Sequence, residues 1–270
     1  MTVQDNHWLY GTFVFLYMNM EGSIHVGTSG WVYKHWNGQL YPKGLPASKW
    51  LEHYASTFHT TEINSSFYRL PSSETIQIWR ETVGKNFIFC PKMSRFLSHM
   101  KKLRDPEEPL QRFFSVFEGL KMKMGPVLVQ LPHMVSFNKG VVENFYRALK
   151  FEFGSYRFVM EVRHSSWLEK ESLGLMELYN IGFVMAQSGA GFPYKEIFTS
   201  DIIYVRFHGP GELYASAYDD NMLKSYAAKF KKWKKEGYTI YAFFNNDIHG
   251  YAVDDALKLQ KLTEEISTKK

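Results

Sequence analysis

Residues 202–209 read IIYVRFHG, and residues 239–247 read TIYAFFNND. Each stretch begins with β-branched and aromatic residues, which favour a buried strand, and ends with polar or charged residues. Six earlier segments repeat this pattern, at residues 24–29, 61–65, 87–92, 127–132, 158–164 and 182–188. Most of the eight expected strands are separated by stretches long enough for a helix. This alternation predicts the α/β class and a single (β/α)8 TIM-type barrel.

Apolar residues recur at helical spacing between most of the expected strands. We expect helices at residues 46–58, 72–83, 106–122, 139–150, 168–180, 221–236 and 251–268. Ser72 is a predicted N-cap, with Thr75 at the position whose amide such a cap binds. The connection at residues 189–200 is short and opens with glycine and proline, so we expect little helix there.

In a (β/α)8 barrel the active site is built from the carboxyl ends of the strands. Side chains alternate between two faces along a strand, so each polar strand end can be assigned to a face. One face collects His25, Gly27, Ser29, Glu62, Asn64, Lys92, Gln130, Glu161, Arg163, Gln187, Arg206, His208, Asn245 and Asp247. The other holds Ile63, Met160, Val162, Val205 and Phe207, which suit the layer between sheet and helices. So many polar groups at one barrel mouth favour a functional site; the alternative is a structural polar plug.

The chain has 270 residues, and a single barrel of about 250 residues is common. Its net charge of +5 and its pI of about 9.0 permit attraction to anions or nucleic acid without requiring it. Cys90 is the only cysteine, which excludes an intramolecular disulfide and a zinc site built from cysteines. The use of cysteine fits a cytoplasmic protein.

Residues 8–20, WLYGTFVFLYMNM, form an apolar segment. They lack the basic start and the small-residue cleavage site of a signal peptide, and they are too short to span a bilayer. We therefore expect no membrane partner. Residues 1–22 are interpreted as an N-terminal extension ahead of a barrel domain at residues 23–270. This extension either caps the barrel bottom or precedes a native start at Met18 or Met20.

The first two loops after strands are rich in groups that bind small molecules. The predicted ligand contacts there are Ser29, Trp31, Tyr33, Trp36, Asn64 and Tyr68. Aromatic rings can stack on sugars or bases, and an amide beside a carboxylate can hold hydroxyl groups. Both loops are therefore expected to line a pocket.

Three cations, Lys92, Arg163 and Arg206, are expected to face the same barrel mouth. They favour an anionic ligand, because guanidinium groups bind carboxylate or phosphate in a planar fork. Arg206 in particular is expected to make a bidentate contact to the anion. The remaining predicted ligand contacts are Gln130, Trp167, Asn245 and Asn246. The two asparagines follow the last strand, where many barrels bind phosphate.

Five strand-end residues are candidates for catalysis: Glu62, Lys92, Glu161, His208 and Asp247. Glu161 is the expected base, Glu62 positions a hydroxyl group, and His208 carries a proton. The three acids and His208 could also hold a hard divalent cation. Because HxH and DxD spacings are absent, we assign no metal ligand and leave the cofactor open. The sequence also lacks a P-loop and the GxGxxG, GxSxG and HExxH motifs.

The motifs GTSGW (residues 27–31), TEINSSFYRLP (61–71), EVRHSSW (161–167), VRFHG (205–209) and FNND (244–247) follow one another along the chain. In these motifs the sequence resembles the YecE-like family, also described as domain of unknown function 72 (DUF72), over about residues 24–262. The resemblance implies a TIM-type barrel of bacteria or archaea without an established activity. Some members are described as sugar isomerase-related, which is an analogy at the level of the fold.

The sequence thus predicts an enzyme that acts on a small, anionic, polyhydroxylated substrate such as a sugar phosphate, by isomerase or lyase chemistry. One alternative is a barrel that binds or processes nucleic acid, suggested by the pI and the basic loop at residues 93–104. Another is a ligand-binding barrel without catalysis. Lysines at residues 224–235 indicate a solvated helix face more than a polyanion site. The oligomeric state is left open.

Overall fold

A computed structural model describes residues 21–264 of the protein, except residues 190 and 193. The expectations for residues 8–20 and for a start at Met18 or Met20 lie outside the described residues. Eight strands are present: β1 (Ile24–Thr28), β2 (Thr60–Ile63), β3 (Ile88–Pro91), β4 (Val127–Gln130), β5 (Phe158–Glu161), β6 (Gly182–Gln187), β7 (Ile202–Phe207) and β8 (Thr239–Phe244). Each coincides with one of the predicted segments to within a few residues.

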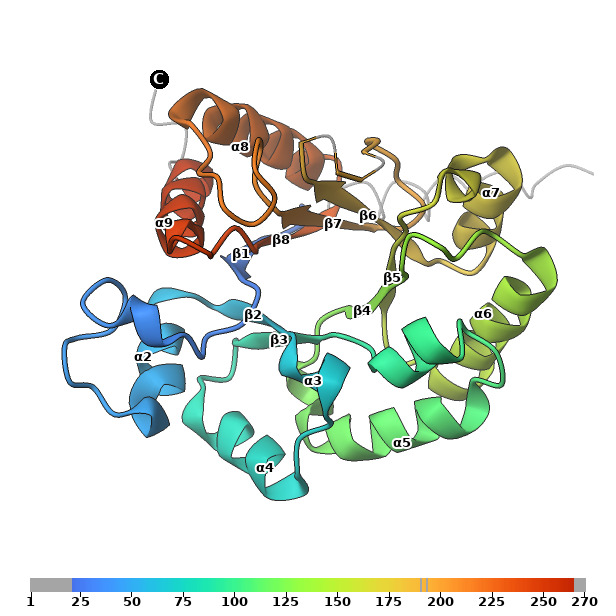
Figure 1. Ribbon diagram of the computed structural model, residues 1–270, viewed down its shortest axis with the longest axis horizontal. Coiled ribbons are helices and arrows are strands. Elements are labelled where there is room, and N and C mark those ends of the chain that lie inside the picture. The colour runs from blue at the N-terminus through green and yellow to red at the C-terminus, as the bar shows by residue number, and fades with distance from the viewer. Residues whose placement is uncertain (1–20, 190, 193, 265–270) are drawn as a thin grey trace, which may run out of the picture.

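The strands run parallel in the order β3-β2-β1-β8-β7-β6-β5-β4. The two ends of this order meet between β3 and β4 through the isolated bridges Phe89–Met124 and Lys92–Leu128. The backbone amide of Met93 also donates a hydrogen bond to the carbonyl oxygen of Leu128 at 2.8 Å. The eight strands therefore form a nearly closed ring, and the predicted (β/α)8 barrel is confirmed (Figure 1).

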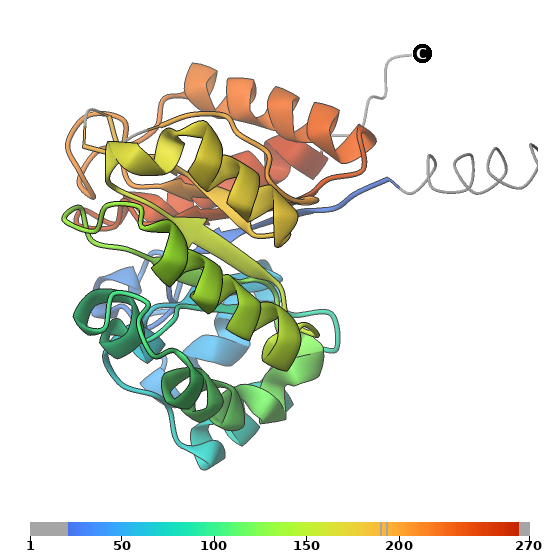
Figure 2. The same ribbon diagram turned by 90° about the vertical axis from the view of Figure 1, so that its right-hand side faces the viewer.

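Helices surround this ring, and most of them connect consecutive strands. The α-helices are α2 (Trp50–Thr57), α3 (Ser65–Tyr68), α4 (Ser73–Thr82), α5 (Glu107–Phe117), α6 (Lys139–Phe153), α7 (Lys170–Leu178), α8 (Asp220–Lys235) and α9 (Tyr251–Glu264). Shorter helical turns are η1 (Lys34–Trp36), η2 (Ala47–Lys49), η3 (Phe96–Met100), η4 (Glu118–Lys123) and η5 (Ser165–Leu168). In Figure 2, α6, α7 and α8 (green, yellow and orange) lie on the outside of the strands.

Local sequence signals account for several helix boundaries. Ser72 caps α4 by accepting a hydrogen bond from the amide of Thr75 at 3.2 Å, as predicted. Asn138 and Asp219 cap α6 and α8 in the same manner. Among the described residues between β6 and β7 there is no helix, which agrees with the expectation for residues 189–200. Helix α3 was not predicted, because it is a single turn directly after β2.

Two apolar cores lie on opposite sides of the strands. The inner core, inside the ring, contains Cys90, Leu128, Val159, Val184, Ile202, Tyr204, Tyr241 and Phe243. The outer core lies between strands and helices and includes the predicted Ile63, Met160, Val162, Val205 and Phe207. Val184 faces inward, so Gln187 lies on the opposite face of β6, where it accepts a hydrogen bond from the Tyr218 hydroxyl. The inward assignment of Gln187 was therefore wrong.

Gly27 in the GTSGW motif is required by strand packing. A Cβ atom at this position would lie 2.2 Å from the carbonyl oxygen of Thr60 on β2 and 3.1 Å from the Tyr54 hydroxyl. The glycine thus lets β1 approach β2 and α2 closely. Close backbone approach was expected from this glycine-rich loop, and at Gly27 the neighbour is the protein itself.

Candidate functional site

A cavity of about 980 Å³ opens at the carboxyl ends of the strands. It is lined by Tyr33, His35, Asn64, Phe67, Tyr68, Lys92, Arg95, His99, Gln130, Arg163, Arg206, Tyr214, Asn245, Asp247 and Ile248. Nine of these residues were predicted from the sequence as catalytic or ligand-contacting groups: Tyr33, Asn64, Tyr68, Lys92, Gln130, Arg163, Arg206, Asn245 and Asp247. Strand-end position and parity thus point to this cavity.

The floor of the cavity is a buried ion-pair network centred on Arg206, which is 1% exposed. Its Nε and Nη2 donate to the two carboxylate oxygens of Glu62 at 3.0 and 2.6 Å. Its Nη1 donates to Glu161 Oε2 at 2.6 Å. Burial acts to lower the pKa of the guanidinium, but the two carboxylates outweigh it and raise the pKa. Arg206 therefore directs its fork at protein carboxylates in this structure, and the expected bidentate contact to an anion stays a prediction.

Both carboxylates of this network are fully buried, and neither Glu62 nor Glu161 is among the cavity-lining residues. Glu62 also accepts hydrogen bonds from Ser29 Oγ at 3.0 Å and from the Tyr204 hydroxyl at 2.9 Å. Burial alone would raise the pKa of Glu161, but Arg206 and the other nearby cations lower it below its usual range. A carboxylate held ionised by so many donors is a poor base. Its expected role as the base is thus not supported by the geometry.

Lys92 follows β3 and reaches the cavity with an amine that lacks a carboxylate partner. The side chain is 9% exposed, and Nζ donates to Gln130 Oε1 at 2.7 Å. The amine also lies over the ring of Phe67, 4.4 Å from its centroid. Among the described residues, no carboxylate oxygen lies within 4.0 Å of Nζ. Burial, followed by repulsion from Arg206, lowers the pKa of Lys92 to about 8.

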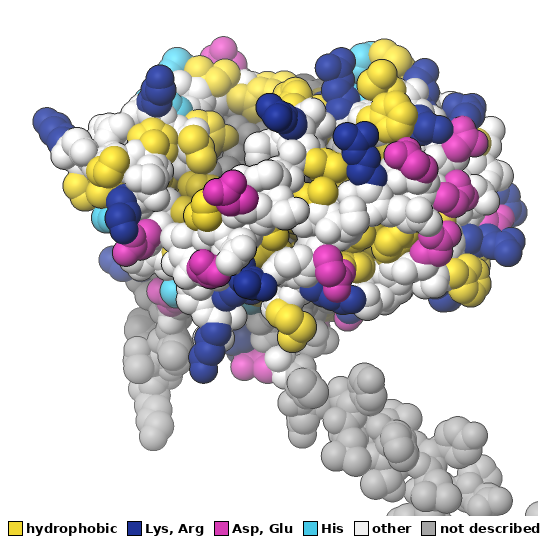
Figure 3. Space-filling view, turned by 90° about the horizontal axis from the view of Figure 1, so that it is seen from below, with side chains coloured by type: hydrophobic (Ala, Val, Ile, Leu, Met, Phe, Trp, Pro, Cys, Tyr) yellow, Lys and Arg dark blue, Asp and Glu magenta, His cyan; other side chains and the backbone are white. Residues whose placement is uncertain are grey.

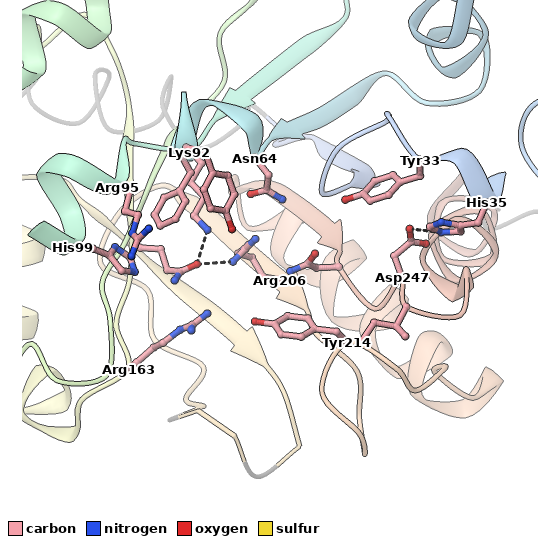
Figure 4. Close-up of a pocket in the computed structure, with 15 residues that line it drawn as sticks. Tyr33, His35, Asn64, Lys92, Arg95, His99, Arg163, Arg206, Tyr214 and Asp247 are labelled. Carbon is pink, nitrogen blue, oxygen red and sulfur yellow. Dashed lines mark hydrogen bonds and ion pairs between the residues drawn. The ribbon is translucent and has the colours of Figure 1, made fainter. Parts of the chain in front are cut away.

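Two arginines and a histidine extend this cationic side of the cavity, which we define as Lys92, Arg95, His99 and Arg163 (Figure 4). Arg163 donates to Glu161 Oε1 through Nε and Nη2, at 3.0 and 2.8 Å, and lies over the ring of Phe192. Arg95 is exposed and has no ion-pair partner among the described residues. Burial and the nearby Lys92 lower the pKa of His99 to about 4, so His99 is neutral at pH 7.

Across the cavity lies an acid–histidine pair (Figure 4). Asp247 Oδ2 is 2.8 Å from Nε2 of His35, and the indole Nε1 of Trp36 donates to both carboxylate oxygens at 3.0 Å. Burial raises the pKa of Asp247, against the lowering effect of these donors. The His35 side chain is 46% exposed, so its other ring nitrogen is open to a ligand. Burial, and then the charge of Asp247, also raises the pKa of Tyr33.

His208 lies behind the cavity instead of in its lining. The amide nitrogen of Asn245 is 3.2 Å from His208 Nδ1, which places the ring proton on Nε2. That nitrogen is 3.9 Å from Glu161 Oε1, and it has no hydrogen-bond partner in the described structure. Burial and Arg206 lower the pKa of His208 to about 3, so the ring is neutral. Its expected role as proton carrier would need an intervening group.

Several predicted ligand contacts are structural. Trp36 is buried and holds Asp247, and Trp167 donates from Nε1 to the carbonyl of Val135 at 2.9 Å. Asn246 donates to the carbonyl of Ser216 and to Asp255. Ser29 and Trp31 line a separate cavity of about 390 Å³ beside α2 and α4. A position beside a strand end does not distinguish packing from ligand contact. These five residues do not line the main cavity, and their contact with a ligand stays a prediction.

Sequence reasoning missed six lining residues: His35, Phe67, Arg95, His99, Tyr214 and Ile248. His35 and Phe67 lie within the two motif loops, and Arg95 lies in the loop noted for its basic character, so a signal existed for these three. Tyr214 and Ile248 lie in loops after β7 and β8, where strand parity no longer applies.

The described residues contain no group of three or more His, Cys, Asp or Glu side chains that could hold a metal ion. Glu62, Glu161, His208 and Asp247 were considered above as ligands for a divalent cation. The carboxylate oxygens of Glu62 and Glu161 accept hydrogen bonds from Arg206. A cation there would have to displace the guanidinium. In the same part of the chain, no helix has the length and apolar character needed to cross a membrane.

A family model described as "Protein of unknown function DUF72" matches residues 25–270. The chain belongs to this family. Among relatives, it is 28% identical over 147 residues to the UPF0759 protein YecE of Escherichia coli K12, a match that covers 54% of the chain and only 51% of that relative. It is 21% identical over 273 residues to the UPF0759 protein YunF of Bacillus subtilis 168, covering 89% of the chain and 95% of YunF.

Solved structures of the DUF72 family share the barrel. A member from Thermotoga maritima MSB8 is 30% identical, with a TM-score of 0.79 over 90% of this chain and all (100%) of the other. One from Enterococcus faecalis V583 is 20% identical, with a TM-score of 0.76 over 89% and 95% of the two chains. The names of these relatives carry no activity, so the chemistry of the DUF72 chain must be argued from its own cavity.

Proposed function

We propose that this DUF72 protein is an enzyme that acts on a small, anionic, polyhydroxylated substrate resembling a sugar phosphate, by isomerase or lyase chemistry. The observation that carries this proposal is a surplus of cations at one side of a concave site. Below and beside the cavity, Arg206, Arg163 and Lys92 face only two carboxylates, those of Glu62 and Glu161. Arg95 adds a further positive charge at the rim.

An anionic group of the substrate would lie between Lys92, Arg95 and Arg163. Each of these side chains lines the cavity. Arg163 uses only Nε and Nη2 for Glu161 in the described structure, which leaves Nη1 for a ligand. Hydrogen bonds between charged groups contribute about 1.5–3 kcal/mol each. Two or three such contacts would give a small anion measurable affinity.

The opposite side of the cavity supplies groups for proton transfer. Asp247 orients His35 through Nε2, as a carboxylate does for a catalytic histidine, and the second ring nitrogen is free to exchange a proton with substrate. Asn64, Tyr214 and Asn245 provide amide and hydroxyl groups for substrate hydroxyls. A substrate would thus have its anion at one side and its reacting hydroxyl or carbonyl groups toward the other.

Isomerase or lyase chemistry is favoured over glycoside hydrolysis by the state of the two barrel carboxylates. Hydrolysis by paired carboxylates needs both to reach the scissile bond. Here Glu62 and Glu161 are buried under the floor and bound to Arg206. Transfer of a proton next to a carbonyl group needs only one positioned base and a cationic environment for the developing charge.

The test is calorimetric titration with inorganic phosphate and with a panel of sugar phosphates. We expect phosphate to bind, and Arg95→Gln to weaken it about tenfold through loss of one charged contact. Lys232→Gln on α8 is the matched control, because Lys232 is 72% exposed and paired with Glu236. If neither phosphate nor any of the sugar phosphates binds, the proposal is contradicted.

The same titration with a single-stranded oligonucleotide tests the nucleic-acid alternative. Tight binding that falls steeply with salt would favour it, because several phosphate contacts release counterions. Figure 3 shows a face on which basic and acidic side chains are interspersed, without one continuous positive stripe. On α8, Lys229, Lys232 and Lys234 are each paired with a glutamate. These surfaces do not resemble a track for a polyanion.

A further inference from the structure

Lys92 differs from every other cation at the site. Arg206 and Arg163 are bound to carboxylates, and Arg95 is exposed to solvent. The Lys92 side chain is nine-tenths buried and lines the cavity. Among the described residues, the partners of its amine are a neutral carbonyl oxygen and an aromatic ring. An anion-binding lysine has no need of such burial, since a charged amine binds anions from a solvated rim as well.

The groups around the amine hold it in one place. Gln130 Oε1 accepts from Nζ at 2.7 Å and lies 3.5 Å from Nη1 of Arg206, so the buried network fixes the amide. The ring of Phe67 supports the amine from another side and is itself held edge-to-face by His99, with the ring centroids 4.9 Å apart. Burial disfavours the charge on Nζ, and Arg206 nearby adds repulsion; together they lower the pKa of Lys92 to about 8, so the neutral amine is accessible near that pH.

We propose that Lys92 is the nucleophile that forms a covalent imine with the carbonyl group of an aldehyde or ketone substrate that also carries an anionic group. This rests on the proposed function and narrows its substrate to carbonyl compounds. A buried lysine in a partly apolar, cationic setting is the arrangement that activates an amine for this chemistry.

The step balances without a cofactor. The lone pair of the neutral Lys92 amine forms a C–N bond to the carbonyl carbon while the C=O π bond breaks, and a proton passes from the nitrogen to the carbonyl oxygen to give a neutral carbinolamine. A second proton, taken from solvent in the open cavity, lets that oxygen leave as water, and a protonated imine remains. Its positive charge then draws electrons from the neighbouring C–H or C–C bond, which is the bond that an isomerase or lyase must break. Hydrolysis restores the amine.

The anion-binding groups would set the geometry. Arg95 and Arg163 line the same side of the cavity as Lys92 (Figure 4). An anionic group held by them would bring a carbonyl a few atoms away to the amine. The competing interpretation is that Lys92 only contributes charge to the anion site. The two differ in one respect, because an imine can be trapped covalently on Nζ and an ion pair cannot.

The experiment treats the full chain with glycolaldehyde phosphate and sodium cyanoborohydride at about pH 8, near the pKa of Lys92. Peptide mapping by mass spectrometry then measures labelling at each lysine. Uncharged glycolaldehyde is the matched probe. Lys232, 72% exposed, is the internal control, since accessibility alone would label it before the buried Lys92. We expect Lys92 to be labelled at least about tenfold faster than Lys232 by the phosphorylated probe.

Two variants sharpen the result. Arg95→Gln should slow labelling of Lys92 by glycolaldehyde phosphate and leave labelling by glycolaldehyde unchanged. Lys92→Arg should remove the label at this position, because a guanidinium stays protonated and forms no imine, and should leave the labelling of Lys232 unchanged. If phosphate binds but Lys92 is not labelled, or is labelled no faster than Lys232, the imine is overturned and the proposed function stands. If neither phosphate nor any sugar phosphate binds and Lys92 is not labelled, both are overturned.

Discussion

The charges beneath the cavity and those along its rim differ in how their partners are arranged. Beneath it, Arg206 is fully enclosed, and its donors meet carboxylate oxygens of Glu62 and Glu161. At the side of the cavity, the Lys92 amine donates a hydrogen bond to the neutral amide of Gln130. Arg95, at the rim, is exposed to solvent. A cation whose donors are bound to carboxylates therefore stabilises the fold. A cation that lacks a carboxylate partner remains available to bind a ligand.

The largest expected effect comes from breaking the enclosed network. Arg206→Met should lower the free energy of unfolding by about 3–5 kcal/mol, because it leaves the buried Glu62 without its cation and Glu161 with Arg163 alone. Arg163→Met should lower it less, since that side chain is 15% exposed and water can replace it beside Glu161. Urea unfolding of both variants measures the difference. Equal, small losses would mean that the floor is not a structural network.

The second prediction concerns Lys92, whose amine is faced by the charged groups Arg206, Glu161, Glu62 and Arg163. Its pKa is lowered from 10.5 to about 8 in the folded protein. Between these two pH values the unfolded chain binds more protons than the folded one, so the contribution of Lys92 to stability rises with pH. The charged amine destabilises the fold below pH 8, and this penalty disappears as the pH approaches 10.5.

Lys92→Met should therefore be more stable than the wild type at pH 7. We expect this advantage to shrink by up to about 3 kcal/mol by pH 10.5. Unfolding in urea at several pH values measures it. NMR of protein reductively methylated with ¹³C-formaldehyde gives the pKa of Lys92 directly. A titration of Lys92 together with the exposed lysines would show that its charge is solvated.

The comparison between floor and rim also explains what the sequence could predict. Strand segments and the barrel follow from the apolar runs, and seven of the fifteen lining residues follow from parity, because a strand end has only two faces. Arg206 and Lys92 both lie at strand ends and are assigned to the same face, so the sequence alone does not distinguish their roles. What separates them is the distance from each cation to Glu62 and Glu161, which depends on the packing of strands far apart in the chain.

Aromatic residues show the same limit. Tyr33 and Trp36 lie in one loop, yet Tyr33 lines the cavity and Trp36 is buried against Asp247. The turn η1 rotates successive side chains to different sides, and no periodicity over three residues could reveal it. Arg95 and His99 depend on η3 in the same way, because this helical segment after β3 had no regular sequence signal.

A smaller effect is expected when the rim is changed instead of the floor. Arg95→Gln should leave the free energy of unfolding within about 0.5 kcal/mol of the wild type, because the side chain is exposed and has no ion-pair partner among the described residues. The same variant should lower phosphate affinity about tenfold. Thermal unfolding with and without phosphate measures both. If the variant is less stable than the wild type in the absence of phosphate, Arg95 stabilises the fold and the prediction is wrong.

The smallest effect is expected for the lysines of α8, a lysine-rich helix that lies on the outside of the barrel (Figure 1). Lys232 is 72% exposed, and its pairing with Glu236 is of the surface kind, which contributes about 0–1 kcal/mol. Changing Lys232 and Lys235 together to glutamine should leave phosphate affinity unchanged, since salt screens exposed charges beyond about 8 Å. Calorimetry at physiological salt decides this. If the double variant loses anion binding while Arg95→Gln keeps it, the ligand is held on the outer helix face. The surplus charge at the cavity rim would then have no part in recognition, and the nucleic-acid alternative would become the better account.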